Sequence, residues 1–158
     1  MEQVVHAMSI RAAITEDLSQ VFALQEQWEA EDITYGYVAG NMVQLLAALA
    51  ETFLLALEDD KILGYITASA HVSEGMAVIP ADVTYLEIDD LYVIPTRRGQ
   101  GIGKVLLDAV LARAAAAGIE YQLLYSSTKD IRRILSFYEE SGFDSWYVQM
   151  YRKTVKHS

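Results

Sequence analysis

Apolar residues recur along the chain with two periods, and these periods predict helices and strands. Four stretches carry apolar residues at helical spacing; they begin at Thr15, Asn41, Gly103 and Asp130, and the last two cover 103–117 and 130–140. Six shorter runs, apolar throughout or alternating, predict strands. The predicted strands are 9–13, 52–57, 62–71, 83–93, 119–125 and 145–152. Helices and strands are therefore expected along most of the sequence.

The order of these elements indicates the fold. Strands 52–57 and 62–71 are joined by a short polar turn, so we expect them to form an antiparallel hairpin. Strand 83–93 is followed by a helix and then by strand 119–125, and such a crossover pairs its two strands in parallel. We therefore expect one domain over residues 1–158 with an α+β fold of α/β-like character. Its mixed, mostly antiparallel sheet would have roughly six to seven strands flanked by about four helices.

Three glycines stand where strand 83–93 gives way to the helix that begins at Gly103. We call residues 96–104, Thr-Arg-Arg-Gly-Gln-Gly-Ile-Gly-Lys, the glycine turn. Glycine is costly to order and is a poor helix former, so this concentration needs a reason. The start of a helix exposes unpaired N–H groups and the positive end of the helix dipole, and glycine lets a bulky anion come close. The glycine turn therefore predicts a phosphate or diphosphate site.

Two familiar phosphate motifs do not fit the glycine turn. A dinucleotide fingerprint, G-x-G-x-x-G counted from Gly101, would need a third glycine where Leu106 stands. A nucleoside-triphosphate loop, G-x-x-x-x-G-K-[ST], would need a glycine at Arg98 and a hydroxyl residue at Val105. The pattern that remains is R-x-x-G-x-G, from Arg98 to Gly103.

The residues around the glycine turn resemble the GNAT superfamily of acetyl-CoA-dependent N-acetyltransferases. Residues 91–103 match each specified position of the family motif L-x-V-x-P-x-x-R-G-x-G-I-G. A second family block, F-Y-E-x-x-G-F, is present at 137–143. The predicted order of elements is also that of the family, so the resemblance covers nearly the whole chain.

This resemblance implies acetyl-CoA as a co-substrate. Main-chain N–H groups of the glycine turn would bind its diphosphate. The edge of strand 83–93 would hydrogen-bond the pantetheine amides, because in this fold the strands before and after the crossover separate, usually with the help of a bulge. The implied cofactor-binding residues are Leu91, Tyr92, Val93, Arg98, Gly99, Gln100, Gly101, Ile102, Gly103 and Lys104. The alternative is a tight turn with no ligand, flanked by solvated arginines.

The resemblance also implies two catalytic residues. Glu87 corresponds to a glutamate that deprotonates the amine in some members of the family. In a regular strand Asp89 shares its face and Asp90 lies on the other, but a bulge can exchange these assignments. Which of the three acids is the base, or whether they are surface acids, therefore stays open. Tyr138, the tyrosine of F-Y-E, would protonate the leaving thiolate, although taken alone it would be assigned to the core.

One position departs from the family pattern. Many members carry an asparagine seven residues before this tyrosine, where it contacts the coenzyme, and here that position is Ile131, beside Asp130. Ser126, Ser127 and Thr128 are candidates to supply the missing contact. We assign no residue to this role.

Composition narrows the classes of function. The chain has 158 residues, 53% of them hydrophobic and 22% charged, as is typical of a globular domain. The absence of cysteine excludes a disulfide framework and a cysteine nucleophile, and the three histidines lack ligand spacing, so we expect no metal. Neither a leader peptide nor a membrane-spanning run is evident, so we expect a cytoplasmic protein without membrane contact. The net charge of −10 argues against nucleic-acid binding.

The acidity also suggests the kind of acceptor. Glu29, Glu31 and Asp32 lie between the first two predicted helices and would join the strand acids in an electronegative entrance. We therefore expect a small cationic amine or a lysine side chain as the acceptor, of unspecified identity. Aromatic residues that fit a pocket and a core equally well are Trp28, Tyr35, Tyr37, Trp146 and Tyr147. The alternative function is a non-catalytic acyl-CoA sensor or partner-binding module, and a homodimer is considered because many family members dimerise.

Overall fold

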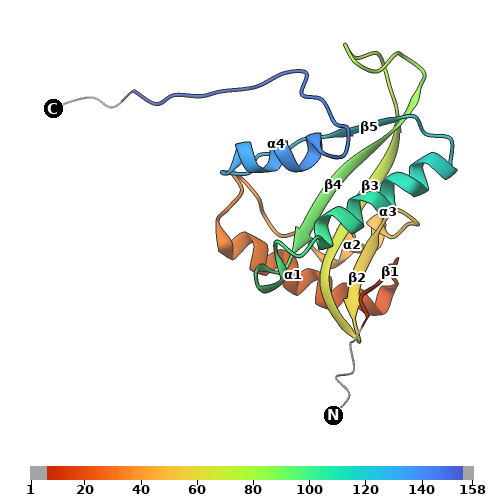
Figure 1. Cartoon of the computed structure of the whole chain (residues 1–158), viewed down its shortest axis with the longest axis vertical. Helices are drawn as coiled ribbons and strands as arrows, with labels where there is room; N and C mark the ends of the chain where they lie inside the picture. Colours follow the sequence, from red (N-terminus) through yellow and green to blue (C-terminus); the bar gives the residue numbers. More distant parts are fainter. Residues whose placement is uncertain (1–6, 155–158) are drawn as a thin grey trace.

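The computed structural model describes residues 7–154, which follow the predicted order of elements as far as the last helix (Figure 1). The strands are β1 (Ser9–Ala12), β2 (Leu54–Glu58), β3 (Lys61–Val72), β4 (Thr84–Val93) and β5 (Tyr121–Leu124). The helices are α1 (Leu18–Glu31), α2 (Met42–Ala48), α3 (Ile102–Ala116) and α4 (Ile131–Glu139). Short 3₁₀ turns, η1 (Thr15–Asp17) and η2 (Pro95–Arg97), precede α1 and the glycines.

The five strands form one mixed sheet in the order β1-β2-β3-β4-β5. Neighbours from β1 to β4 are antiparallel, and β5 is parallel to β4, as the crossover through α3 predicts. The expected α+β fold with four helices is confirmed. The expected count of six to seven strands is wrong, because residues 145–152 form no strand. Their alternating sequence suits a strand, but a strand also needs a neighbour, and none pairs with this segment in residues 7–154.

Local signals explain where the first two helices begin. Asn41 caps α2, since its Oδ1 accepts the Gln44 N–H at 3.0 Å while Gln44 Oε1 accepts the Asn41 N–H at 3.0 Å. Before α1, the Asp17 carboxylate accepts the Ile14 N–H at 2.9 Å. Arg11 anchors that carboxylate from β1 at 2.6 Å.

The sheet lies between two helical layers. In Figure 1, α3 crosses the front of the sheet, whereas α1 and α2 lie behind it. Apolar side chains of α3 that are fully or almost fully buried are Ile102, Leu106, Leu107, Val110 and Ala114. Leu18 and Val21 of α1 are buried from the other side, and one continuous core therefore surrounds the sheet.

One residue of β4 has no partner on β3. Thr67 pairs with Asp90 and Ala68 pairs with Ile88, so Asp89 is the extra residue of a bulge. Directly opposed residues share a face of a sheet, and residues two apart on β3 do so as well.

The bulge sets the direction of the acidic side chains. On β3, Thr67 pairs with Asp90, and Ser69, two residues later, pairs with Glu87. Glu87 and Asp90 therefore lie on the same face, which is the outcome expected with a bulge and not that of a regular strand. Asp89 also reaches this face, since its Oδ2 accepts the Ser69 hydroxyl at 2.9 Å.

Strands β4 and β5 separate at the bulge. They pair in parallel from Tyr85 and Tyr121 to Ile88 and Leu124, where β5 ends. Strand β4 continues to Val93, and in the described part of the chain its residues 89–93 have no partner strand on the β5 side. Unpaired main-chain groups therefore line this edge, next to the turn that leads into α3.

Candidate functional site

The glycine turn presents a row of free hydrogen-bond donors. In residues 7–154, no hydrogen bond uses the main-chain N–H of any residue from Gly99 to Lys104, six in succession. The first N–H that bonds back is that of Val105, to Gly101 O at 3.1 Å. Helix starts leave such donors for an anion, and here the row is longer than the usual four.

Two glycines give the turn its shape. Gly99 and Gly101 have φ angles of 76° and 82°, a left-handed conformation that other residues adopt at a cost. A Cβ at either position would meet no atom within 4 Å, so the space beside the turn is open. The predicted phosphate site thus combines free donors with open space.

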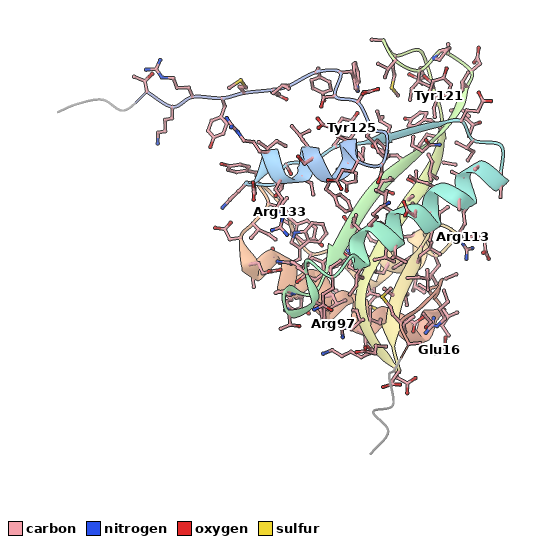
Figure 2. The ribbon with its side chains drawn as sticks, in the orientation of Figure 1. Glu16, Arg97, Arg113, Tyr121, Tyr125 and Arg133 are labelled. Atoms are coloured by element: carbon pink, nitrogen blue, oxygen red, sulfur yellow. The ribbon has the colours of Figure 1, made fainter. Side chains whose placement is uncertain are left out.

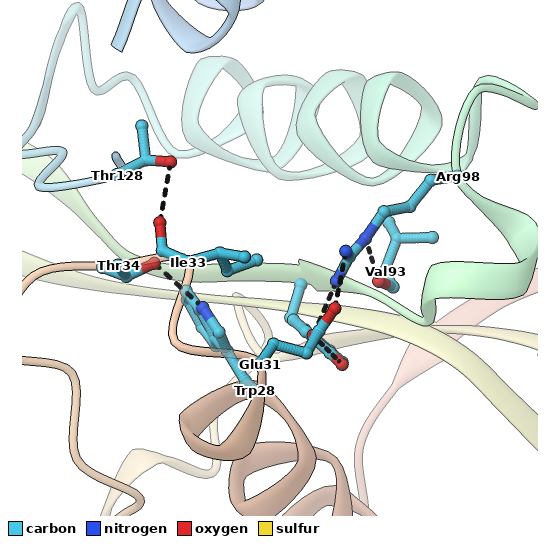
Figure 3. Close-up of polar contacts among 8 residues, drawn as sticks. Trp28, Glu31, Ile33, Thr34, Val93, Arg98 and Thr128 are labelled. Carbon is cyan, nitrogen blue, oxygen red and sulfur yellow. Dashed lines mark hydrogen bonds and ion pairs between the residues drawn. The ribbon is translucent and has the colours of Figure 1, made fainter. Parts of the chain in front are cut away.

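The Arg98 side chain is bound within the protein, as Figure 3 shows. Its two terminal nitrogens donate to the Glu31 carboxylate at 2.8 and 2.9 Å, and its Nε donates to Val93 O at 2.9 Å. The Tyr92 hydroxyl donates to the same carboxylate at 2.7 Å, and the guanidinium lies 5.3 Å from the Tyr92 ring centre. Arg98 therefore joins the end of α1, strand β4 and the glycine turn; its predicted contact with a ligand stays a prediction.

Other side chains of the glycine turn also have partners. Lys104 pairs with Asp108 one helical turn later, at 2.9 Å. Gln100 Oε1 accepts the Arg97 Nε–H at 2.9 Å, and Arg97 pairs with Glu58 at 2.6 Å (Figure 2 labels Arg97, before α3). The groups left free in this turn are thus mainly those of the main chain.

Asp90 is the most enclosed of the acids on β4. Its Oδ2 accepts the Tyr65 hydroxyl at 3.1 Å and a long hydrogen bond from Gln25 Nε2 at 3.4 Å. Burial raises the pKa of the Asp90 carboxyl, and the neighbouring charge of Asp89 adds to this, although the Tyr65 hydrogen bond opposes it. Asp90 is therefore a carboxylate held among neutral donors.

Glu87 and Asp89 share a second group of polar side chains. Glu87 Oε2 lies 3.3 Å from His71 Nε2, which lies 2.9 Å from the Ser69 hydroxyl that donates to Asp89. Burial raises the pKa of the Asp89 carboxyl, against the hydrogen bond from Ser69. We call Glu87, Asp89 and Asp90 the acidic cluster. No lysine or arginine in the described residues forms an ion pair with it.

Aromatic rings adjoin the acidic cluster on the α1 face. Trp28 stacks on Tyr37 with ring centres 4.0 Å apart and on Tyr92 at 5.2 Å. The Tyr37 hydroxyl is buried and interacts with the Tyr65 hydroxyl, but it forms no hydrogen bond of regular geometry among the described residues. Burial, together with the charge of Asp90, raises its pKa. Trp28 and Tyr37 are thus beside the acids, whereas Tyr35 is exposed.

The entrance is less acidic than the sequence suggested. Glu31 is neutralised by Arg98, and Asp32 pairs with Lys129 at 2.9 Å. Glu29 remains exposed without such a partner among the ion pairs of residues 7–154. The negative charge is therefore concentrated in the acidic cluster.

Tyr138 lies on the helix that packs beside the glycine turn. Its neighbour Phe137 is 3.5 Å from the position of a Cβ built on Gly103, so α4 contacts the start of α3. The Tyr138 ring meets Phe137 and Phe143 edge-on, at 5.0 and 5.6 Å, and burial raises the pKa of its hydroxyl to about 12. Tyr138 thus packs against the core, as its position alone suggested, and also lies near the turn.

The segment before α4 holds the loop after α1 in place. The Thr128 and Ser127 hydroxyls donate to Ile33 O at 3.3 Å and Tyr35 O at 3.1 Å (Figure 3 shows the first bond). Ile131, at the position of the family asparagine, is exposed at the first turn of α4. The two hydroxyls are thus used within the protein, and what replaces the asparagine stays unassigned.

In this fold a parallel strand pair separates beside a glycine-rich helix start. The sequence matches the model of the acetyltransferase (GNAT) family over residues 12–143, most of the chain. The protein therefore belongs to the GNAT acetyltransferase family, and the resemblance found in the sequence is confirmed.

Solved structures with the same fold include several acetyltransferases. An aminoglycoside acetyltransferase, meta-AAC0020 from an uncultured soil metagenomic sample, is 22% identical with a TM-score of 0.70, covering 97% of this chain and 100% of its own. A mutant of the BH1408 protein from Bacillus halodurans is 22% identical with a TM-score of 0.74, covering 92% and 99%. A predicted acetyltransferase with acetyl-CoA from Clostridium acetobutylicum is 18% identical with a TM-score of 0.69, covering 92% and 96%. A search of curated proteins gave no match.

Two further expectations concern metals and membranes. Residues 7–154 contain no group of three or more His, Cys, Asp or Glu side chains arranged to hold a metal ion. In that same part of the chain, no helix has the length and apolar character needed to cross a membrane. The expected cytoplasmic location and lack of nucleic-acid binding stay predictions.

Proposed function

We propose that the protein transfers the acetyl group of acetyl-CoA to a primary amine by direct attack in a ternary complex. The observation that carries this proposal is the row of six free N–H groups beside an open space at the start of α3. A diphosphate is a suitable ligand for such a row, because each oxygen accepts several hydrogen bonds and the helix dipole favours negative charge. The relative that was solved with acetyl-CoA has the same fold and supports this choice.

The free edge of β4 suits the rest of the cofactor. Residues 89–93 lack a partner strand on the β5 side, so their outward N–H and C=O groups are available to amides, except Val93 O, which already accepts the Arg98 Nε–H. The pantetheine arm carries two amides and would bind beside Leu91, Tyr92 and Val93 as an added strand does. This arrangement would bring the thioester toward the bulge, where the acidic cluster begins.

The proposed chemistry needs one base and one acid. Glu87 is the proposed base, which takes a proton from the ammonium so that the nitrogen lone pair can attack the carbonyl carbon. A C–N bond forms, the C–S bond breaks, and the thiolate takes the proton of the Tyr138 hydroxyl. The second proton that the nitrogen must lose to become an amide would return to the Tyr138 oxygen, and the proton held by Glu87 would pass to solvent. With its pKa raised to about 12, Tyr138 stays protonated at neutral pH and is available as a donor.

The acidic cluster supports a cationic acceptor. Three carboxylates lie on one face of β4 without a lysine or arginine ion pair in the described residues, and the charge of Asp90, the most enclosed of them, is costly unless it is paired. The stacked rings of Trp28 and Tyr37 adjoin them and would contact an ammonium, whereas Tyr92 is buried and its ring already faces the Arg98 guanidinium. We therefore propose a small cationic amine as acceptor, or a lysine side chain. Two of the structural relatives are aminoglycoside acetyltransferases, one of them in complex with sisomicin.

The test uses two glycines at opposite ends of α3. Gly101 and Gly118 have φ angles of 82° and 74°, and a Cβ at either would meet no atom within 4 Å. Both Gly→Asp variants therefore have similar strain, but only Gly101→Asp adds a negative charge at the proposed diphosphate site. Calorimetric titration with CoA should show affinity reduced by about tenfold or more in Gly101→Asp and little changed in Gly118→Asp. Equal affinities in the two variants would contradict the proposal.

Turnover separates an enzyme from a sensor. Thiol release from acetyl-CoA is measured with a panel of amines for the wild type, Glu87→Gln and Tyr138→Phe. Release that depends on a cationic amine and falls in both variants supports the proposed reaction. Tight binding of acetyl-CoA with no turnover of any amine would instead favour the non-catalytic sensor. Preference for neutral or acidic acceptors would contradict the proposed role of the acidic cluster.

A further inference from the structure

A cavity of about 320 Å³ lies between α2, β3 and β4, next to the acidic cluster. Strand β3 pairs with β2 only as far as Ile66, so residues 67–72 have no partner strand on that side in the described part of the chain. Ala68 and Ala70, in this unpaired part of β3, line the cavity. Five of its eleven lining residues are alanines, and such short side chains leave space between the elements. Ligand sites range from roughly 300 to 1,000 Å³, so this cavity suits a small ligand.

The walls of the cavity offer few free polar groups. Seven of the lining residues are alanine, leucine or isoleucine, and three carry hydroxyls. All three hydroxyls form hydrogen bonds within the protein, with lengths from 2.6 to 3.2 Å; they belong to Thr52, Thr67 and Ser69. The cavity therefore suits an apolar group, which needs no hydrogen-bond partner.

One carboxylate is the exception. Asp89 is the only charged residue that lines the cavity, and it is exposed to solvent. Its Oδ2 accepts the Ser69 hydroxyl at 2.9 Å, whereas no hydrogen bond in residues 7–154 uses its Oδ1. Glu87, the proposed base, lies on the same face of β4. Asp89 can therefore accept a hydrogen bond from an ammonium group beside the proposed base.

Apolar surface continues from the cavity onto α2. Val43 and Leu46 are 76% and 47% exposed, and Ala47, at helical spacing from both, is exposed and lines the cavity. The side of a surface helix that faces water is usually polar. On α2 only Leu45 is buried, so this exposed apolar side is not part of the core. An apolar group that extends out of the cavity would remain in contact with α2.

We propose that this cavity binds the apolar group of the acceptor, so that the acceptor is a small primary amine with one alkyl or aryl group. The ammonium would lie at Asp89, and the carbon skeleton would lie among the alanines. A polyamine would place a second charge in this apolar space, and a lysine residue would bring main-chain amides to walls whose hydroxyls are already used. This inference rests on the proposed acetyl transfer and specifies its substrate.

The first test is a series of amines of increasing length. For ethylamine, butylamine and hexylamine, kcat/KM of the wild type should rise by about fourfold for each methylene group that leaves water. Butylamine should react at least about tenfold better than 1,4-diaminobutane, whose second ammonium is costly to bury. Equal values for the three alkylamines, or a preference for the diamine or for a lysine-containing peptide, would overturn the inference.

Two alanines provide matched variants for this series. Ala47 and Ala23 are exposed residues of α2 and α1, and each lines a cavity. The cavity at Ala23, of about 420 Å³, has Lys61 as its only charged lining residue and so does not suit a cation. Ala47→Phe should remove most of the dependence on chain length, because its ring would occupy the proposed site, whereas Ala23→Phe should keep it. The same dependence in both variants would overturn the inference.

The second test detects binding without turnover. Protein labelled with ¹³C at its alanine methyl groups is titrated with hexylamine in the presence of CoA and followed by NMR. The methyl signals of Ala47, Ala68 and Ala70 should shift, and that of Ala23 should not. Turnover of amines without these shifts would overturn the inference and leave acetyl transfer standing. Shifts at these methyls without turnover of any amine would contradict acetyl transfer alone, and the absence of both would overturn both proposals.

Discussion

Replacing Glu31 by glutamine tests the link between α1, β4 and the glycine turn. The carboxylate accepts two hydrogen bonds from Arg98, at 2.8 and 2.9 Å, and one from the Tyr92 hydroxyl at 2.7 Å. Glutamine keeps the shape of the side chain but offers one acceptor oxygen and no charge. The Arg98 guanidinium then loses its counter-ion while it remains partly enclosed.

The size of the effect follows from the exposure of the pair. The Glu31 and Arg98 side chains are 19% and 29% exposed, so the pair is neither fully buried nor freely solvated. Hydrogen bonds to charged groups contribute about 1.5–3 kcal/mol each when well enclosed, and exposed pairs much less. We therefore expect Glu31→Gln to lower the free energy of unfolding by about 2 kcal/mol, or roughly a 30-fold change in the unfolding equilibrium.

Urea unfolding at neutral pH measures this loss, with Glu51→Gln as the control. Glu51 pairs with Arg113, but its side chain is 85% exposed, so its neutralisation should leave the unfolding midpoint nearly unchanged. The reasoning is refuted if the two variants unfold at the same urea concentration, or if Glu31→Gln matches the wild type.

The difference between wild type and Glu31→Gln should also depend on pH. Burial opposes the charge of the Glu31 carboxyl, but hydrogen bonds from Arg98 and Tyr92 outweigh it and hold its pKa below the ordinary value. A carboxyl with a lowered pKa in the folded state stabilises the protein above its unfolded pKa, and this contribution is lost as the pH falls through the folded pKa. The difference in unfolding free energy should therefore be constant near neutrality and shrink below about pH 4.

Three further changes give distinct results. Tyr138→Phe should lower kcat by about 100-fold, because the hydroxyl is the proposed acid. CoA affinity and the unfolding midpoint should change little, because this hydroxyl makes no hydrogen bond in residues 7–154. Equal kcat values for the variant and the wild type would show that Tyr138 is not the acid. Asp90→Asn should be at least as stable as the wild type at pH 7 while KM for the amine rises. Burial raises the pKa of Asp90 in the folded protein, so its ionised form destabilises the fold above this raised pKa. The difference in unfolding free energy between Asp90→Asn and the wild type should therefore narrow as the pH falls toward the pKa of Asp90 in the unfolded chain. A marked loss of stability of Asp90→Asn at pH 7 would contradict this. Gly64→Ala should destabilise the fold by about 3 kcal/mol in thermal unfolding, because its Cβ would stand 2.6 Å from Tyr92 O; an unchanged melting temperature would refute the close approach.

Much of the fold was predictable because its signals are local. The periodicity of residues 103–117 and the turn at Glu58–Lys61 placed α3 and the β2–β3 hairpin within a few residues of their observed bounds. The predicted strand at 145–152 was wrong, because strand formation depends on more than local signals. Alternation shows that a segment can pair, but whether a neighbouring strand exists depends on the rest of the fold or on a second chain.

The candidate site was predictable only in part. The glycine turn is contiguous in sequence, so its composition was enough to point to an anion site. The bulge at Asp89 depends on the register between β3 and β4, which no local pattern specifies, and it decides the face of Asp90. Glu31 and Arg98 are 67 residues apart in sequence, and their ion pair had no sequence signal. Because Arg98 neutralises Glu31, this residue does not add negative charge to the predicted entrance.

We propose that main-chain N–H groups at the start of α3 bind the diphosphate of coenzyme A. Titration of the ¹⁵N-labelled protein with CoA, followed by NMR, reports on each of these groups separately. The largest chemical-shift changes should occur at the amides of Gly99 to Lys104, with small changes at Gly118 at the far end of the helix. Changes that are absent from Gly99 to Lys104, or that are centred elsewhere in the chain, would contradict it.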